Sequence, residues 1–310
     1  MAKIDLKDKD VWEAEVNFYQ NSTTETRLAR AKDLGYSNVE SYCNFMRLHG
    51  IHLTVPISRR EKFNKPEVIR EPCLVIFDTQ VPFQDAEFIN HLLDLAMDWG
   101  IKQGISGGDL LNMTSFSRFY EKPLDKVWEK EREEAIKVLV ALVDAIPDWL
   151  LVKGNHEDFL LKKLEEQIEH DDILSVIDKR TGLLKGFRAT DYYYCEVKFG
   201  GSIWRISHPR NISVIHGRVP QRLCERFHCN VASGHGHLAG MTPDYSGKYY
   251  ACDVGVTCDP LRLDYVSLRD STRPTQCQGA LILQLGDDGK CKPYHILPET
   301  ADWTALKRLY

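Results

Sequence analysis

Two histidines separated by one residue follow a short apolar run in the last third of the chain. The run, residues 231 to 233, ends at Gly234, and His235 and His237 come next. A turn after a strand can direct both imidazole rings into one small space at the end of that strand. Imidazole is a common ligand of borderline metal ions. Single pairs of this kind are frequent on protein surfaces, so the prediction of a metal site depends on the residues that accompany them.

Four other apolar runs also end at residues that can bind a metal ion. The polar side chains that follow them are Asp78 with Gln80, then Asp109, then Asn155 with His156, and finally His208. In an open α/β layer, ligands and catalytic groups gather beyond the carboxyl ends of the strands. Five strand ends that carry carboxylate, amide and imidazole groups therefore predict a metal site with catalytic groups beside it.

This ordered set of segments resembles the metallophosphoesterase (calcineurin-like) family. The family pattern is Asp-x-His, Gly-Asp, Gly-Asn-His-Asp/Glu, a lone His and Gly-His-x-His, in that order. The matching segments are Asp78-Thr79-Gln80, Gly108-Asp109, Gly154-Asn155-His156-Glu157, His208 and Gly234-His235-Gly236-His237. Five blocks in the right order are far more specific than any one of them. The match departs from the family at Gln80, which stands where the family has His.

The resemblance implies a phosphoesterase with two divalent cations, in which a metal-bound hydroxide attacks the phosphate ester. Asp109 would bridge the two cations. The other ligands would be Asp78, Gln80 and His237 for the first cation, and Asn155, His208 and His235 for the second. His156 would instead serve as proton donor or charge stabiliser at the leaving oxygen, since an imidazole titrates near the operating pH. Asp109 or Glu157 would orient His156.

Gln80 leaves two interpretations open. Its amide oxygen could coordinate the first cation as a harder and weaker donor than imidazole, which favours Mn²⁺ or Mg²⁺ over Zn²⁺. Alternatively, Gln80 does not coordinate and a water molecule takes that place. Either way the first cation binds more loosely than in the usual pattern. We favour manganese as the cofactor, with iron, zinc and magnesium as alternatives.

Two further residues near His208 could belong to the site. His216 is a rival for the role of His208, and we favour His208 because it ends the clearer apolar run, residues 202 to 207. Arg210 could contact a phosphate of the substrate, with an ordinary surface salt bridge as the alternative.

The residues after Asp109 narrow the substrate class. Protein Ser/Thr phosphatases carry Gly-Asp-x-x-Asp-Arg-Gly, whereas Gly108-Asp109 is followed here by Leu110-Leu111-Asn112-Met113-Thr114. We therefore favour phosphodiesters, either nucleic acid, which would make the protein a nuclease, or nucleotide-like compounds. The competing hypothesis is a nucleic-acid-binding or scaffold protein in which Gln80 marks a degenerate metal site.

The predicted elements around these motifs indicate an α/β domain over residues 71–310. Apolar residues at helical spacing predict helices at about 85–99, 125–145 and 159–170. Alternating residues predict a hairpin of strands 192–197 and 202–207, and two more strands follow at about 279–285 and 292–297. The family resemblance implies a four-layer α/β/β/α sandwich of two mixed sheets.

Residues 1–70 fall outside the family pattern and are predicted to form a small N-terminal helical appendage with a basic connector. Helices at 24–34 and 39–48, broken at Gly35, have the outline of a helix-turn-helix. Residues 41–70 hold six basic and two acidic side chains, a net charge of +4. These features favour contact with nucleic-acid phosphates. A helical cap or an oligomerisation element is the alternative.

Composition limits the classes of partner and compartment that the sequence allows. The 310 residues carry a net charge of −5, so no global basic field indicates nucleic acid. No apolar run approaches the about 18 residues of a membrane span, and the N-terminus lacks the apolar core of a signal peptide. The nine cysteines are scattered without a Cys-x-x-Cys pair. Reduced thiols of this kind predict a cytoplasmic protein.

Overall fold

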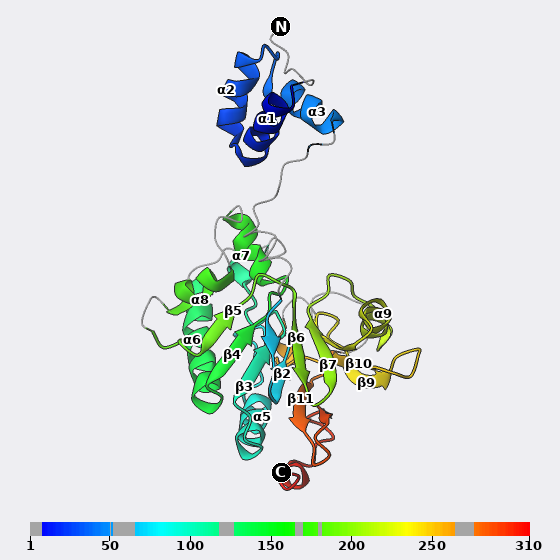
Figure 1. Ribbon diagram of the computed structural model, residues 1–310. Helices are drawn as coiled ribbons and strands as arrows, with labels where there is room; N and C mark the ends of the chain where they lie inside the picture. The colour runs from blue at the N-terminus through cyan, green and yellow to red at the C-terminus, as the bar shows by residue number, and fades with distance from the viewer. Residues whose placement is uncertain are drawn as a thin grey trace. The chain divides into compact units, whose positions relative to one another are not determined.

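The computed structural model describes residues 8–49, 51, 66–117, 127–164, 170–178, 182–263 and 276–310. The chain divides into two compact units, Met1–Lys65 and Pro66–Tyr310. Figure 1 shows the helices of the first unit and the sheets of the second.

The described part of the first unit contains three short helices. They are α1 (Lys9–Asn21), α2 (Thr24–Asp33) and α3 (Val39–Leu48). The side chains of Asp8, Thr23 and Asn38 accept backbone N–H bonds at the three helix starts, which satisfies donors that the helices cannot. The second and third helices confirm the two predicted from the caps.

A small core holds the first unit together. Its fully buried members are Tyr19, Ala31, Tyr42 and Met46. Glu15 is also buried, and it accepts bonds of 2.6 Å from both the Arg30 guanidinium and the Tyr42 hydroxyl. The predicted basic connector contains Arg59, Arg60, Lys62 and Lys65, which lie outside the described residues.

The second unit is built on two mixed six-stranded sheets. The first has the order β12-β11-β2-β3-β4-β5 and the second has the order β1-β6-β7-β8-β10-β9. The first sheet comprises β2 (Cys73–Ile76), β3 (Gln103–Ser106), β4 (Asp148–Leu151), β5 (Phe187–Ala189), β11 (Ala280–Leu285) and β12 (Cys291–Ile296). The second comprises β1 (Val68–Ile69), β6 (Tyr194–Phe199), β7 (Ser202–Ser207), β8 (Asn230–Ser233), β9 (Ala239–Pro243) and β10 (Tyr250–Val254).

The two sheets pack face to face with helices outside. Successive strand residues point to opposite faces, so Val75 of β2 packs with Trp204 and Cys252 of the second sheet, whereas Leu74 and Ile76 face the helices. Figure 1 shows the helices beside the sheets. They are α5 (Ala86–Asp98), α6 (Val127–Ala145), α7 (Glu157–Lys163), α8 (His170–Asp178), α9 (Arg218–Phe227) and α11 (Trp303–Leu306). Cys224 of α9 packs with Val231 and Ala251 on the outer face of the second sheet. The predicted α/β/β/α sandwich is confirmed.

Several element bounds differ from the expectation. Val68 and Ile69, which the sequence placed in the connector, form β1 and pair in parallel with Glu196 and Val197 of β6. A strand of two residues has no periodicity that a sequence could reveal. The helix expected at 159–170 is replaced by α7, which ends at Lys163, and by α8, which begins at His170.

Among the described residues, no helix is long and apolar enough to cross a lipid bilayer.

Candidate metal centre

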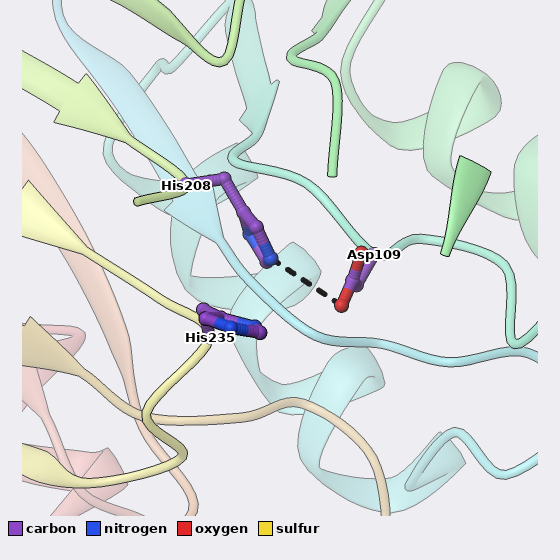
Figure 2. A group of neighbouring side chains, drawn as sticks. All are labelled: Asp109, His208 and His235. Carbon is purple, nitrogen blue, oxygen red and sulfur yellow. Dashed lines mark ion pairs between the residues drawn. The ribbon is translucent and has the colours of Figure 1, made fainter. Parts of the chain in front are cut away.

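The predicted site residues all follow the carboxyl ends of strands. Strands β2, β3 and β4 are parallel neighbours in one sheet, and β7 and β8 are parallel neighbours in the other. Their carboxyl ends therefore meet at one edge of each sheet. Figure 2 shows that Asp109, after β3, and His208 and His235, from the second sheet, are directed into one space.

Asp109, His208 and His235 form the closest group. One ligand atom from each lies within 4.8 Å of the others. The Nε2 atom of His208 is 3.3 Å from Oδ2 of Asp109 and 3.2 Å from Oδ1 of Asn155. Asp109 and His208 are each only 1% exposed. The structure thus brings together the four residues that the resemblance implied as bridging ligand and second-cation ligands.

A second group lies beside the first. The Nε2 atom of His237 is 3.1 Å from Oδ1 of Asp78 and 3.4 Å from Nε2 of Gln80. The backbone N–H of His235 donates to the other carboxylate oxygen, Oδ2 of Asp78, at 2.9 Å. One carboxylate thus connects the two groups, which are the sets expected for two cations. Gln80 is completely buried next to His237, where the family pattern places a histidine ligand.

The backbone at this edge is held in an unusual conformation. Five site residues have positive φ angles, at 48° for Asp78, 46° for Gln80, 53° for Asp109, 68° for His235 and 56° for His237. Residues other than glycine rarely adopt this backbone region, and such strain persists only where the surrounding structure imposes it. The backbone N–H groups of Asp78 and Gln80 donate to the carbonyls of Gly108 and Asp109 at 3.1 and 3.0 Å. The strands therefore fix the directions of the ligands before any ligand binds.

The motif glycines leave room for the polar side chains. A Cβ atom added at Gly108 would lie 2.5 Å from Nδ1 of His208, and one at Gly154 would lie 2.1 Å from Oδ1 of Asp109. At Gly234 it would lie 2.6 Å from Oδ2 of Asp78. These distances are all too short for a real side chain, so each glycine permits the close approach of a site residue.

His156 is fixed by two backbone contacts. Its N–H donates to Oδ1 of Asp109 at 2.8 Å, and its Nδ1 lies 2.7 Å from the carbonyl oxygen of Asn112. A carbonyl only accepts, so Nδ1 carries the proton. The other ring nitrogen, Nε2, is 3.7 Å from Oδ2 of Asp109. Asp109 therefore does contact His156, as expected, and the carbonyl of Asn112 is an additional partner that the sequence did not reveal.

Glu157 has a different role from the one expected. Its carboxylate does not contact the His156 ring, but accepts the backbone N–H groups of Asp109, Leu111 and Gly154 at 3.0 to 3.2 Å. Burial and the nearby charge of Asp109 raise the pKa of Glu157 to about 7. Glu157 ties the loop after β3 to the loop after β4, which positions both motif segments.

This chain is similar in fold to proteins among the solved structures. A scan of protein-family models and a search of curated proteins gave no match. Vacuolar protein sorting 29 from Cryptosporidium parvum is 14% identical, with 74% of this chain and 97% of that chain covered and a TM-score of 0.39. YfcE, a phosphoesterase from E. coli, is 12% identical, with coverage of 73% and 98% and a TM-score of 0.37. A Zn²⁺ complex of Vps29 from Entamoeba histolytica has the same identity and coverage and a TM-score of 0.35.

Two mixed sheets, with the five motif segments after their strands, are the arrangement that the resemblance to metallophosphoesterases implied. His208, and not its rival His216, lies with Asp109 and His235. His216 is exposed and packs against Gly240, where an added Cβ would lie 2.0 Å from its Nε2. His216 is absent from the group that Asp109, His208 and His235 form.

Arg210 lies beside the site on the loop after β7. It is exposed, and its guanidinium carbon is 5.6 Å from the centre of the Tyr193 ring. Among the described residues, Arg210 forms no ion pair with a carboxylate, so the salt bridge given as its alternative role is not found there. Contact with substrate stays a prediction.

A serine-hydrolase motif also occurs in the second unit. Gly104 to Gly108 reads Gly-x-Ser-x-Gly. The serine, Ser106, ends β3 as a fully buried residue between the parallel strands β2 and β4. Because a nucleophile in this motif must be exposed on a sharp turn, the segment does not indicate a serine hydrolase.

The electrostatics of the cluster favour bound cations. Burial raises the pKa of Asp109, but the neighbouring His208 and His156 outweigh burial and hold that pKa well below its usual range. Burial lowers the pKa of His208, yet the charge of Asp109 outweighs it and raises the pKa to about 9. Asp109 therefore stays ionised, as a carboxylate ligand of a metal ion must be. Two carboxylates, three imidazoles and two amide groups are a donor set that fits divalent metal ions of borderline or hard character.

Proposed function

We propose that this protein is a metal-dependent phosphoesterase whose substrates are phosphodiesters, in nucleic acid or in nucleotide-like compounds. The observation that carries the proposal is the pair of adjacent ligand groups, buried or half-buried, that are joined through Asp78. Asp109, Asn155, His208 and His235 form one group, and Asp78, Gln80 and His237 form the other. They would hold two divalent cations, with Mn²⁺ as the favoured ion and Fe, Zn or Mg as alternatives.

Bound cations would supply positive charge to the phosphate oxygens and acidify a water molecule. The protein supplies the proton for the leaving group. The Asn112 carbonyl fixes the His156 Nδ1–H, so Nε2 is the atom that can give a proton to a leaving oxygen. The protonated imidazole has Oδ2 of Asp109 at 3.7 Å as its counter-charge. The hydrogen bond from the His156 backbone to Asp109 holds this geometry.

Hydrolysis assays in the presence of Mn²⁺ test the proposal. The substrates are bis-nitrophenyl phosphate, nitrophenyl phosphate, and single- and double-stranded DNA. We expect the diesters to be cleaved, and we expect Asp109→Asn and His156→Ala, purified in parallel, to lose this activity. Equal activity in the wild type and both variants would identify a contaminant. No hydrolysis of any ester by metal-loaded protein would refute the proposal.

A non-catalytic nucleic-acid-binding or scaffold protein is the second candidate. Gln80 is the observation that favours it, since an amide replaces the imidazole expected beside His237. This candidate predicts DNA binding without hydrolysis at saturating Mn²⁺, whereas the phosphoesterase cleaves the DNA it binds.

The partner and the compartment are also proposals. The consecutive helices α2 and α3 support contact of the first unit with nucleic acid. Cysteines buried as free thiols, among them Cys73, Cys195 and Cys252, support a reducing compartment such as the cytoplasm.

A further inference from the structure

A groove lies beside the segment that carries His208. Its volume is about 640 Å³, and it is lined by residues 209–215 and by the first turns of α9. Pro209, one of the lining residues, directly follows His208 of the metal centre. A ligand in this groove would therefore lie next to the segment that carries a proposed metal ligand.

The groove carries an uncompensated positive charge. Arg210, Arg218 and Arg222 line it, and no Asp or Glu is among the lining residues. In the part of the chain that the structure describes, none of the three forms an ion pair. This local charge contrasts with the net charge of −5 for the whole protein. The groove therefore selects an anionic ligand.

The arginines on α9 are spaced regularly. Arg218, Arg222 and Arg226 follow one another at four-residue intervals, and all three are exposed. Each interval advances about 6 Å along a helix. The opposite face of α9 is anchored to the second sheet through Cys224. A row of arginines on an anchored helix matches a ligand with repeated phosphates better than a ligand with a single phosphate.

The groove also exposes apolar side chains. Ile212, Val214 and Ile215 are 44%, 58% and 53% exposed, and all three line the groove. Single-strand binding proteins combine a basic groove that follows the backbone with side chains that contact the faces of the bases, usually aromatic ones. In this groove the exposed aliphatic side chains offer that contact surface. The bases of a duplex are already paired and stacked, and they cannot reach such a surface.

We propose that this groove binds a single strand of nucleic acid and guides it to the metal centre. Arg218 and Arg222 contact successive backbone phosphates, and Arg210 contacts the phosphate nearest His208. Ile212, Val214 and Ile215 contact the sugars and bases. This proposal rests on the proposed function for its substrate, and it names single-stranded nucleic acid as the class.

Binding of a fluorescently labelled 12-nucleotide oligothymidine to the full-length protein, followed by anisotropy in EDTA, tests the groove without turnover. We expect Arg218→Ala/Arg222→Ala to raise Kd at least tenfold. We also expect the dependence of log Kd on log salt to become shallower by about 1.4, or about 0.7 for each phosphate that is no longer bound. Lys102→Ala/Arg308→Ala removes the same charge from exposed positions outside the groove, and it should leave Kd within twofold.

Arg218→Lys/Arg222→Lys keeps the charges and should restore binding to within about threefold, which separates charge from misfolding. Thermal unfolding checks that each variant folds. A wild-type protein that does not bind the oligothymidine, equal Kd values in the two alanine pairs, or tighter binding of a duplex or a phosphopeptide would overturn the proposal. Because binding is measured without metal, failure of hydrolysis alone leaves this result intact and refutes only the proposed function.

Discussion

The Gly-His-Gly-His segment contains its own matched pair of test positions. Gly234 and Gly236 are two residues apart, yet their surroundings differ completely. A Cβ atom at Gly234 would lie 2.3 Å from Cδ1 of Phe77 and 2.6 Å from Oδ2 of Asp78, whereas nothing lies within 4 Å of one at Gly236. Gly234→Ala should therefore disturb the metal centre, and Gly236→Ala should not.

The size of the effect can be worked out from these distances. In Gly234→Ala, Oδ2 of Asp78 must retreat by about 0.8 Å to reach an ordinary contact of 3.4 Å. Asp78 is fully buried and accepts bonds from the His235 backbone and the His237 ring, so it cannot move without them. Overpacking of this kind costs about 1–3 kcal/mol of stability, and a displacement near 1 Å can lower a rate about 100-fold.

The assay compares kcat/KM for bis-nitrophenyl phosphate at saturating Mn²⁺ with the Kd for Mn²⁺ and the Tm. We expect Gly234→Ala to lose about 10- to 100-fold in kcat/KM and to bind Mn²⁺ more weakly. Gly236→Ala should stay within about threefold of the wild type, because its backbone does not require glycine. Indistinguishable behaviour of the two variants would refute the reasoning, since it would mean that Asp78 does not hold a cation.

Three further predictions concern single side chains. Gln80→His should retain Mn²⁺ more tightly in dialysis, and unchanged retention would show that residue 80 does not face the first cation. His156→Ala should lower kcat by about 10²–10⁴-fold while the metal content, measured by elemental analysis, stays constant; a normal kcat would exclude His156 as the proton donor. Burial raises the pKa of Glu131 to about 7 from 4.5. Between these two pH values the folded state keeps a proton on Glu131 that the unfolded state releases. The stabilisation that this proton confers is therefore complete below pH 4.5 and is lost as the pH rises through about 7. Glu131→Gln should flatten this decline in unfolding free energy, which is on the order of 3 kcal/mol, in urea titrations at a series of pH values. A decline of the same size in the variant would show that Glu131 is not its source.

The sequence could predict the site because each motif follows an apolar run. Asp78, Asp109 and His208 could be placed at strand ends from their neighbours alone, and parallel strands then bring such ends together. The structure also shows His208 where the sequence left His216 as a rival.

Contacts made by the backbone had no signal in the sequence. The Asn112 carbonyl that fixes His156 and the N–H groups bound by Glu157 are backbone groups, so the type of residue that carries them does not indicate these contacts. Strand β1 was missed because its two residues pair with a strand more than one hundred positions away. Helix α9 was missed because Pro220 and the surrounding arginines obscure the apolar spacing, although its buried face rests on the second sheet.

Metal content measures the central claim most directly. The protein is loaded with Mn²⁺, dialysed against metal-free buffer and examined by elemental analysis beside Asp109→Asn. The two adjacent ligand groups, with Asp109 as the proposed bridging ligand, predict about two cations per chain in the wild type and a clear loss in the variant. Absence of bound Mn²⁺, Fe or Zn from the wild-type protein after loading with each metal would contradict the account.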